Sequence, residues 1–299
     1  RILLGTAALI AAGVGAVAVL RRKPPPVRPP GVPLSAFDAK STAEQVTAGI
    51  NLAGKTVLIT GATSGIGLEA MRVLAMRGAH VLGTGRTLEK AAAACAGVTG
   101  RTTPLALELT DFPSVVACAK AVQALGVPLD ALICNAGIMA LPQLEQVYGL
   151  EKQFVTNHLG HFLLVNRLLP QVQAAPQGRV VVVSSSALKW ADGTAIEWDN
   201  LSGARDYSAN RAYGQSKLAN SLFSLELARR LAGSATTSNS MNPGAVLTQL
   251  QRHAPAWAVS LGNVVGPAFM KAPAEGASTV CYLAAHPGVA AVSGRYFIQ

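Results

Sequence analysis

The stretch Thr56-Val57-Leu58-Ile59-Thr60-Gly61-Ala62-Thr63-Ser64-Gly65-Ile66-Gly67 decides the fold. Its first half is a short apolar run that predicts a buried strand, and its glycines lie directly before a predicted helix at 66–77. Glycines at such a junction let backbone amides approach a pyrophosphate, and the helix N-terminus adds partial positive charge. A tight turn is the alternative, but the position after the first strand of the domain favours a dinucleotide site. The candidate residues are Gly61, Ser64, Gly65, Ile66 and Gly67.

Strand and helix patterns alternate along the rest of the chain. The residues from Arg179 to Ser184, with their run of valines, predict a strand that is buried on both faces. We therefore expect a single doubly wound parallel α/β sheet of the Rossmann type, with helices on both faces. The predicted strands are 56–60, 80–84, 104–109, 129–134, 179–184, 235–241 and 295–298, and the predicted helices are 66–77, 88–96, 114–125 (capped by Thr110 or Asp111), 147–170 and 211–232.

The end of the second predicted strand, Thr84-Gly85-Arg86, indicates which dinucleotide binds. An NAD enzyme usually places an acidic residue here for the ribose 2′-hydroxyl. The first acid is Glu89, which we interpret as a favourable charge in the first turn of the next helix. Arg86 offers a guanidinium to a 2′-phosphate, and Gly85 leaves room for it. This favours NADP(H), with a surface arginine before the helix as the alternative.

Tyr213 and Lys217 lie four residues apart in a predicted helix, so their side chains share one face. A nearby ammonium, together with an oxidised nicotinamide, should lower the pKa of the tyrosine from about 10. Tyr213 would then be the general acid in reduction and the general base in oxidation. Tyr207 and Arg211 have the same spacing, but an arginine is always charged and cannot tune a proton relay.

A set of motifs accompanies this pair in a fixed order: Thr60-Gly61-x-x-x-Gly65-x-Gly67, Asn135-Ala136-Gly137, Asn157, Ser185, Tyr213-x-x-x-Lys217 and Pro243-Gly244. Together they resemble the short-chain dehydrogenase/reductase family over residues 51–298. The stretches Val155 to Phe162 and Arg211 to Asn220 resemble the branch of retinol dehydrogenases, protochlorophyllide reductases and related membrane-associated reductases. Trp198-Asp199-Asn200-Leu201, in the long segment between Ser185 and Tyr213, also fits that branch.

The resemblance implies a role for each motif. Ser185 would hydrogen-bond the substrate oxygen, Tyr213 would transfer the proton, and Lys217 would lower the tyrosine pKa and bind ribose. Asn157 would kink its helix and hold a water of the proton relay, which completes the implied catalytic set. The other implied cofactor contacts are Asn135, Ala136 and Gly137 beside the adenosine ribose, and Pro243 and Gly244 through Thr248 over the nicotinamide carboxamide.

Some positions stay open or depart from the family pattern. Ser184 and Ser186 are alternatives to Ser185, because the three serines are neighbours. Glu108 stands where the family often has an aspartate that touches adenine. Two further departures are Cys134 and Val182, and none of the three removes a catalytic group.

The charge distribution argues against a nucleic-acid partner. The chain has 299 residues and a formal charge of +10, but residues 1–30 carry five basic side chains and no acid. The remaining chain has 20 basic and 15 acidic side chains, an ordinary balance without a basic cluster interleaved with aromatics. Half of the residues are hydrophobic and 13% are charged, compared with roughly 25% charged in an average soluble domain. A sizeable core is expected.

Cysteine and histidine spacing predicts no metal site. The four cysteines, Cys95, Cys118, Cys134 and Cys281, form no C-x-x-C pair, and buried free thiols in a reducing compartment are the simplest interpretation. His158 and His161 lie three residues apart without an H-E-x-x-H pattern around them. We interpret both histidines as packing beside Asn157.

The N-terminal region predicts a membrane anchor. Residues 2–20 are an uncharged apolar run just long enough to cross a bilayer, and Arg21-Arg22-Lys23 follows. The positive-inside tendency then places the catalytic domain in the cytoplasm. A cleaved signal peptide ending at Ala16-Val17-Ala18 is the alternative. The expected organisation is an anchor at 1–23, a proline-rich linker and lead-in at 24–50, and an NADP(H)-binding oxidoreductase domain at 51–299.

The sequence thus predicts an NADP(H)-dependent oxidoreductase that moves a hydride between nicotinamide and a carbonyl or alcohol of a small-molecule substrate. The anchor and the apolar segment 245–272 suggest a lipophilic substrate, with 186–212 as the other wall of its pocket. One alternative is a non-catalytic nucleotide-binding scaffold or redox sensor of the same fold. A light-driven protochlorophyllide reductase is another. The resemblance also leaves open a homodimer that pairs through the helix bearing Tyr213.

Overall fold

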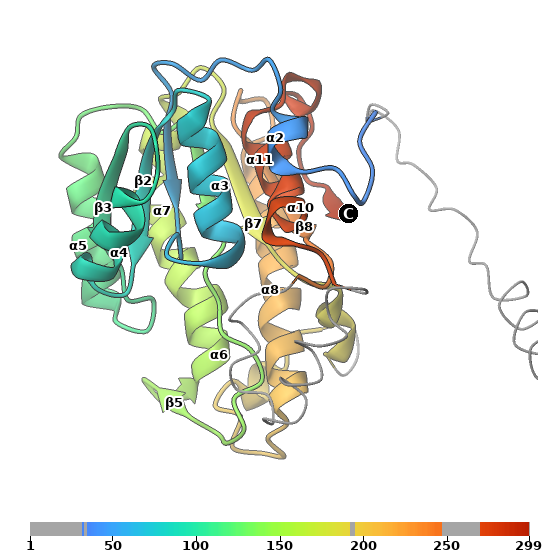
Figure 1. The fold of residues 1–299 in the computed structure, drawn as a ribbon. Helices are drawn as coiled ribbons and strands as arrows, with labels where there is room; N and C mark the ends of the chain where they lie inside the picture. The colour runs from blue at the N-terminus through green and yellow to red at the C-terminus, as the bar shows by residue number, and fades with distance from the viewer. Residues whose placement is uncertain (1–31, 33–34, 192–194, 247–269, 299) are drawn as a thin grey trace, which may run out of the picture. The chain divides into compact units, whose positions relative to one another are not determined.

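The computed structural model describes residues 32, 35–191, 195–246 and 270–298 (Figure 1). The chain divides into two units, 1–32 and 33–299, and apart from Val32 every described residue belongs to the second. The segment predicted as an anchor and the predicted cofactor residue Thr248 therefore lie outside the described residues. Across the described ranges, no helix combines the length and the apolar character needed to cross a bilayer.

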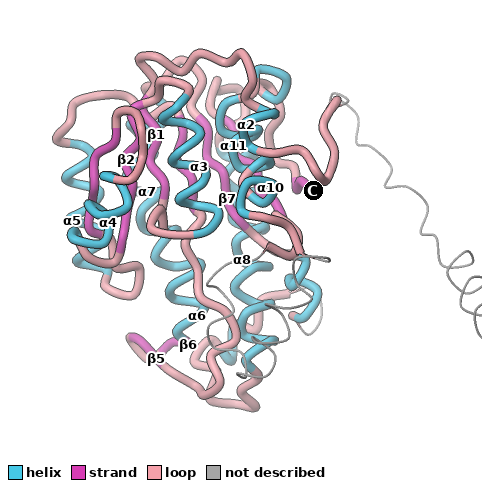
Figure 2. The backbone as a smooth tube through the Cα atoms, viewed as in Figure 1, coloured by secondary structure: helices cyan, strands magenta, loops and turns pink. Residues whose placement is uncertain are grey.

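A seven-stranded sheet forms the centre of the second unit (Figure 2). Its order is β3-β2-β1-β4-β7-β8-β9, and all neighbouring strands run parallel. This confirms the predicted Rossmann-like sheet and its number of strands. The strands are β1 Thr56–Ile59, β2 His80–Gly85, β3 Thr102–Ala106, β4 Ala131–Cys134, β7 Arg179–Val183, β8 Thr237–Asn242 and β9 Tyr296–Ile298.

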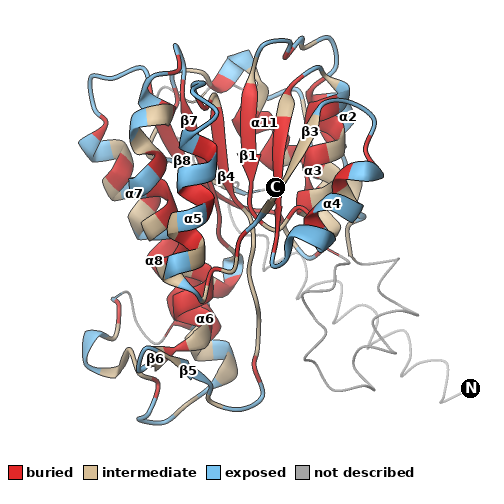
Figure 3. Ribbon diagram, turned by 90° about the vertical axis from the view of Figure 1, so that its left-hand side faces the viewer, coloured by how far each residue is buried: buried red, intermediate tan, exposed pale blue. Residues whose placement is uncertain are grey.

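Helices cover both faces of the sheet, as the view along its edge shows (Figure 3). One face carries α3 Gly65–Met76, α4 Leu88–Ala96 and α11 Ser278–Ala285, and the other carries α5 Phe112–Gln123, α7 Gly160–Gln173 and α8 Ala209–Arg230. The strand order reverses between β1 and β4, because β2 and β3 continue on one side and β7, β8 and β9 on the other. In open α/β sheets, ligands bind beyond the carboxyl ends of the strands at such a switch point.

The central strands are apolar because both of their faces are covered. Leu58 of β1, Leu132 of β4 and Val180 of β7 are fully or almost fully buried. They belong to the core cluster that also contains Leu164 and Leu168 of α7. Burial on both faces explains why these strands are continuous apolar runs rather than alternating ones.

The lead-in before the first strand packs against α3 and the turn after it, within the second unit. The short helix α2 Ala43–Val46 begins at a capping box, in which Thr42 and Gln45 bond each other's backbone amides. Glu44 pairs with Arg72 of α3, and Arg77 donates to the Thr47 hydroxyl at 3.1 Å. The packed structure therefore includes residues before Leu52.

The helix predicted at 147–170 starts later and is interrupted. Residues 146–151 form a small antiparallel hairpin, with strands β5 Gln146–Val147 and β6 Leu150–Glu151. Its turn residues Tyr148 and Gly149 both have positive φ, 54° and 73°, which a helix does not allow. The chain continues as α6 Lys152–Phe154, a π-helical turn η1 Val155–Leu159, and α7.

Short elements complete the described structure. They are the 3-10 turns η2 Ser186–Trp190, η3 Trp198–Asn200 and η5 Pro287–Val289, and the helix α10 Pro273–Gly276.

Candidate active site

A cleft of about 1080 Å³ lies at the carboxyl ends of the strands. Its lining comes from the segments that follow β1, β2, β3, β4, β7 and β8. Most of the predicted site residues line this one cleft: Gly61, Ser64, Gly65, Ile66, Arg86, Asn135, Ala136, Gly137, Ser185, Tyr213, Lys217, Pro243 and Gly244. Two predicted residues, Gly67 and Asn157, lie directly behind its wall and contact lining residues.

The glycine turn between β1 and α3 brings backbone amides to the cleft. Gly61 has a φ of +68°, and a Cβ on Gly67 would collide with the Gly61 carbonyl and the Asn135 amide. Ser64 caps α3, but its side chain makes no capping hydrogen bond, and the first turn holds no acid. The orphan amides of this helix end are therefore suited to bind an anion such as a pyrophosphate.

Arg86 and Lys90 line the cleft beyond the end of β2, and we call this part the arginine end. Both side chains are exposed. No hydrogen bond or ion pair joins either side chain to another of the described residues. Thr87 caps α4 by accepting from the Lys90 amide at 3.3 Å, so Arg86 lies directly before the helix and Lys90 lies in its first turn.

The opposite part of the cleft holds Ser185, Trp190, Tyr213 and Lys217, and we call it the tyrosine end. Tyr213 and Lys217 lie on α8 and are almost fully buried. The Lys217 ammonium lies 5.5 Å from the centre of the Tyr213 ring and donates to the Val183 carbonyl at 3.1 Å. The predicted pair therefore shares one face of its helix.

Burial dominates the ionisation of this pair. It raises the pKa of Tyr213 to about 12, with a hydrogen bond to Ser185 acting in the opposite direction. It lowers the pKa of Lys217 to about 8. The pKa of Tyr213 is therefore raised in the protein without nucleotide, and the lowering expected from the ammonium together with an oxidised nicotinamide stays a prediction. Removing the phenolate from water causes this rise.

The three neighbouring serines differ in what their hydroxyls do. The Ser184 hydroxyl is buried, donates to the Lys217 carbonyl at 2.8 Å and accepts from Ser221 at 2.9 Å. The Ser185 hydroxyl accepts from the Ala187 amide at 3.1 Å and also bonds Tyr213. Ser186 is exposed, in the first position of η2. Ser185 is therefore the serine with a direct link to the tyrosine.

Asn157 lies in the π-helical turn η1 and is fully buried. Its side-chain amide accepts from the Ile138 amide and donates to the Ile138 carbonyl, both at 2.9 Å. It also donates to the Ser216 hydroxyl of α8 at 2.9 Å. Asn157 thus joins the segment after β4 to the helix that bears Tyr213. A π turn is a local widening of the helix and is frequent at functional sites.

Known proteins match the part of the chain that forms this cleft. A family model for short chain dehydrogenase matches residues 55–258. The chain belongs to the short-chain dehydrogenase family. The relative "Short-chain dehydrogenase TIC 32 B, chloroplastic" of Brassica napus is 41% identical over 279 residues, which cover 88% of this chain and 86% of the relative. Retinol dehydrogenase 14 of Homo sapiens is 42% identical over 264 residues, which cover 82% and 78%.

A solved structure supports the same assignment. The chain resembles the Pseudomonas aeruginosa RhlG/NADP active-site complex with a TM-score of 0.65 and 26% identity, covering 83% of this chain and 96% of that one. Together with the retinol dehydrogenase, these matches confirm the predicted family and the branch that the motifs indicated.

Four apolar residues that line the cleft were not predicted as site residues from the sequence. Trp190 lines the tyrosine end, and its ring lies 6.2 Å from that of Tyr213. Ile138, Met139 and Leu141 line the cleft after β4, although sequence reasoning assigned them no role. Their positions follow directly after Asn135-Ala136-Gly137, which was the available signal.

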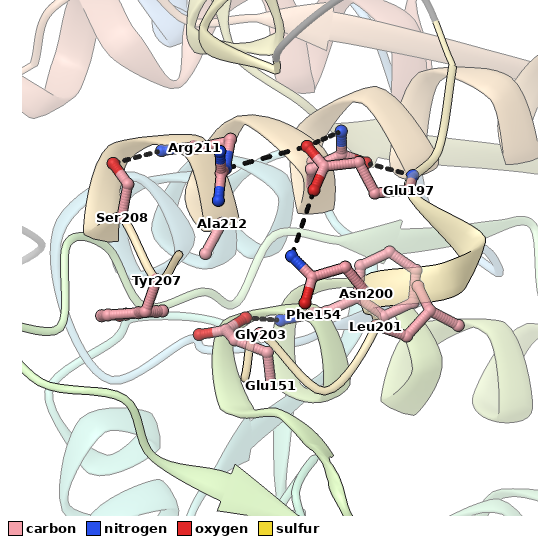
Figure 4. A pocket seen from close by; sticks show the side chains of 11 residues that line it. Glu151, Phe154, Glu197, Asn200, Leu201, Gly203, Tyr207, Ser208, Arg211 and Ala212 are labelled. Atoms are coloured by element: carbon pink, nitrogen blue, oxygen red, sulfur yellow. Dashed lines mark hydrogen bonds and ion pairs between the residues drawn. The ribbon is translucent and has the colours of Figure 1, made fainter. Parts of the chain in front are cut away.

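Tyr207, the tyrosine that the sequence analysis set aside, lines a second, smaller pocket (Figure 4). Glu151, Glu197, Tyr207 and Arg211 are among its lining residues. The Tyr207 hydroxyl donates to the Leu141 carbonyl at 2.8 Å. Tyr207 is not among the residues that line the large cleft. The segment 186–212 is therefore divided, with its first residues at the cleft and its last ones at this pocket.

In the described ranges, no group of three histidine, cysteine or acidic side chains is arranged to hold a metal ion. The four cysteines are free and buried, as predicted. Glu108, at the position that departs from the family, lines the cleft and accepts from the Thr110 hydroxyl at 2.7 Å.

Proposed function

We propose that the protein is an NADP(H)-dependent oxidoreductase that transfers a hydride between nicotinamide and a lipophilic carbonyl or alcohol. The observation that carries this proposal is the placement of Ser185, Tyr213 and Lys217 at one end of a cleft whose other parts are a glycine turn and a basic pair. The first set suits proton transfer to a substrate oxygen, and the second set suits a phosphorylated dinucleotide.

The residues of the cleft fit the cofactor. The orphan amides beyond Gly61 would hold the diphosphate, and the Asn135-Ala136-Gly137 segment would flank the adenosine ribose. Pro243 and Gly244 would border the nicotinamide, together with Thr248. When bound, the nicotinamide supplies or accepts the hydride.

The protein's own groups would move the proton. In reduction, Ser185 donates a hydrogen bond to the carbonyl oxygen, and the Tyr213 hydroxyl gives that oxygen its proton. A pKa near 12 keeps Tyr213 protonated at neutral pH, so the proton that it would donate is present. Lys217 would hold the ribose, and its ammonium would stabilise the phenolate that remains after Tyr213 gives up its proton. Asn157 fixes the segment after β4 against α8.

Cofactor preference would depend on the arginine end. Arg86 and Lys90 are exposed cations, and the described residues place no acid that could bind a ribose 2′-hydroxyl at the end of β2. A guanidinium pairs well with a phosphate. The solved relative whose name includes NADP is consistent with this choice.

A lipophilic substrate would fit the tyrosine end. Ile138, Met139, Leu141, Trp190 and Val246 line the cleft with apolar side chains. Trp190 is 50% exposed although it lies beside Tyr213. An exposed aromatic ring next to the reacting group is suited to cover an apolar molecule. The similarity to retinol dehydrogenase 14 points in the same direction.

Attachment and assembly are part of the proposal. Residues 2–20 would anchor the protein in a membrane, with the domain of residues 51–299 facing the cytoplasm behind the linker of residues 24–50. Phe162 of α7 and Leu222 and Leu225 of α8 are exposed, and a homodimer would cover them. Membrane fractionation of the full chain and of a variant lacking residues 2–20 tests the anchor.

The deciding experiment is fluorescence titration of the purified protein with NADPH and NADH, for wild type and Arg86→Ala. We expect NADPH to bind at least about tenfold more tightly than NADH, and the variant to lose that preference. A screen of lipophilic aldehydes and ketones follows, with Tyr213→Phe as the inactive reference. If neither nucleotide binds, the oxidoreductase proposal fails.

A further inference from the structure

His161 of α7 is 1% exposed and takes no part in the proposed chemistry, yet both of its ring nitrogens have hydrogen-bond partners. Its Nδ1 lies 2.8 Å from the Asn157 carbonyl oxygen, one helical turn earlier. Its Nε2 lies 2.8 Å from the Thr60 hydroxyl, 101 residues away in the sequence. The ring therefore spans the space between the glycine turn and the π-helical turn.

The partners determine which nitrogen carries the proton. The Asn157 carbonyl can only accept, so Nδ1 must donate to it. The Thr60 hydroxyl already accepts from the amides of Asn135 at 2.8 Å and Ala136 at 3.0 Å. Its single proton is then free to donate, and His161 Nε2 is the nearer acceptor, since the Ile133 carbonyl lies 3.4 Å away. The geometry fits one neutral tautomer, with the proton on Nδ1.

The environment of the ring supports the neutral form. Burial lowers the pKa of His161 to about 4, and the charges of Lys217 and His158 act in the same direction. The hydrogen bond to the Asn157 carbonyl acts against this lowering. An imidazole with this pKa is uncharged at neutral pH, which leaves Nε2 able to accept from Thr60.

Beyond Asn157 the hydrogen bonds continue to the reacting tyrosine. The Asn157 amide donates to the Ser216 hydroxyl at 2.9 Å, and that hydroxyl donates to the Tyr213 carbonyl at 2.7 Å. A continuous buried network thus runs from Thr60 through His161, Asn157 and Ser216 to the backbone of Tyr213. Such networks hold groups in fixed geometry when every member is satisfied.

We infer that His161 is a positioning residue for the proposed reaction: Nε2 fixes the Thr60 turn that holds the cofactor segment, and Nδ1 fixes the Asn157 turn behind Tyr213. The inference rests on the proposed function. A leucine in place of His161 would remove the ring's hydrogen bonds to the Asn157 carbonyl and the Thr60 hydroxyl. Losing a hydrogen-bond partner destabilises a buried polar group.

Two conservative variants separate the two contacts. In His161→Asn the shorter amide reaches only the Asn157 carbonyl, so we expect nucleotide Kd to rise about tenfold while kcat stays within about threefold. In His161→Gln the longer amide reaches only Thr60, so we expect kcat to fall about tenfold while Kd is retained. His161→Leu should show both effects.

Controls distinguish positioning from general destabilisation. His158→Asn and His158→Gln change the neighbouring histidine, which bonds Asn220 at 3.2 Å outside this network, and should leave kcat and Kd unchanged. Thermal midpoints for all variants report stability separately. The inference is overturned if the two His161 variants lose stability to a similar extent but show no split between kcat and Kd.

Nitrogen NMR of the wild-type protein tests the network without any turnover or variant. Long-range proton–nitrogen correlations of the His161 ring should show a protonated Nδ1 and an unprotonated Nε2 at neutral pH. A proton on Nε2, or an imidazolium ring, would contradict the inferred contacts. If wild type binds no nucleotide while this tautomer is present, the proposed function fails and the network itself stands.

Discussion

The two ends of the cleft are built in opposite ways. At the tyrosine end, Tyr213 and Lys217 are 4% and 3% exposed, and buried hydrogen bonds fix their surroundings. At the arginine end, Arg86 and Lys90 are exposed and lie on the surface without a bonded partner among the described residues. The proposed reaction would use both ends, but hydrogen bonds within the protein fix only the side chains of the tyrosine end.

This difference separates two kinds of control. A buried group with fixed neighbours acts through geometry and a shifted pKa, so its effects should be large and insensitive to salt. An exposed cation acts through a screened charge, so its effects should be moderate and weaken as ionic strength rises. The comparison predicts that rate depends on the tyrosine end and cofactor choice on the arginine end.

The largest effect is expected for Tyr213→Phe. Loss of the proton donor should lower kcat by about 10²–10⁴-fold, the usual contribution of general acid–base catalysis. Nucleotide Kd should stay close to wild type, because the ring remains in place. NADPH consumption with a substrate from the carbonyl screen measures the rate, and fluorescence titration measures Kd.

Tyr207→Phe is the matched control for that prediction. Its hydroxyl bonds the Leu141 carbonyl beside the smaller pocket, so kcat should change little. A Tyr213→Phe variant that kept more than a tenth of the wild-type rate would remove the tyrosine from the proposed mechanism.

Gly67→Ala tests the close approach behind the cleft. The added methyl group would meet the Gly61 carbonyl and the Asn135 amide, and overpacking of this kind costs about 1–3 kcal/mol. We expect a lower thermal midpoint and weaker binding of both nucleotides. Gly97→Ala is the control, because its nearest atom would lie at 3.6 Å and its φ is not positive. Equal stability of the two variants would contradict the expected collision between the added methyl group at position 67 and its neighbours.

Local patterns account for what the sequence predicted well. The apolar runs and the glycine junction lie within a few residues of each other, and so do Tyr213 and Lys217, so short-range rules located them. The predicted helix start at residue 147 was wrong because Tyr148 and Gly149 have positive φ, and a tyrosine gives no sequence signal for that conformation.

Long-range packing accounts for the rest. Burial raises the pKa of Tyr213 in the protein without nucleotide, and the spacing of Tyr213 and Lys217 gave no indication of that burial. His161 packs beside Asn157 as expected, but its contact with Thr60 spans two elements far apart in the chain. No spacing rule relates these two residues, so only the folded structure could connect them.

Arg86→Ala tests the arginine end. The preference for NADPH over NADH should fall by about tenfold, because the variant loses the single exposed ion pair between Arg86 and the 2′-phosphate. The affinity for NADH, which lacks that phosphate, should stay nearly unchanged. Raising the salt concentration should reduce the wild-type preference in the same way. Lys120→Ala, which removes an exposed lysine of α5 that does not line the cleft, should have no effect. A preference that survives in Arg86→Ala would assign cofactor choice to other residues.

A pH dependence that arises from Lys217 is the last expected effect. Its pKa is lowered to about 8, so the ammonium is present below that pH and is lost as pH rises through it. Tyr213, with a pKa raised to about 12, stays protonated over this range and cannot produce the change. We expect kcat/KM for reduction to fall roughly tenfold between pH 7 and pH 9. Lys217→Arg keeps its charge over this range and should show a lower but flat profile. A flat wild-type profile would mean that the charge on Lys217 has no role in reduction, and an unchanged alkaline limb in Lys217→Arg would assign the titration to another group.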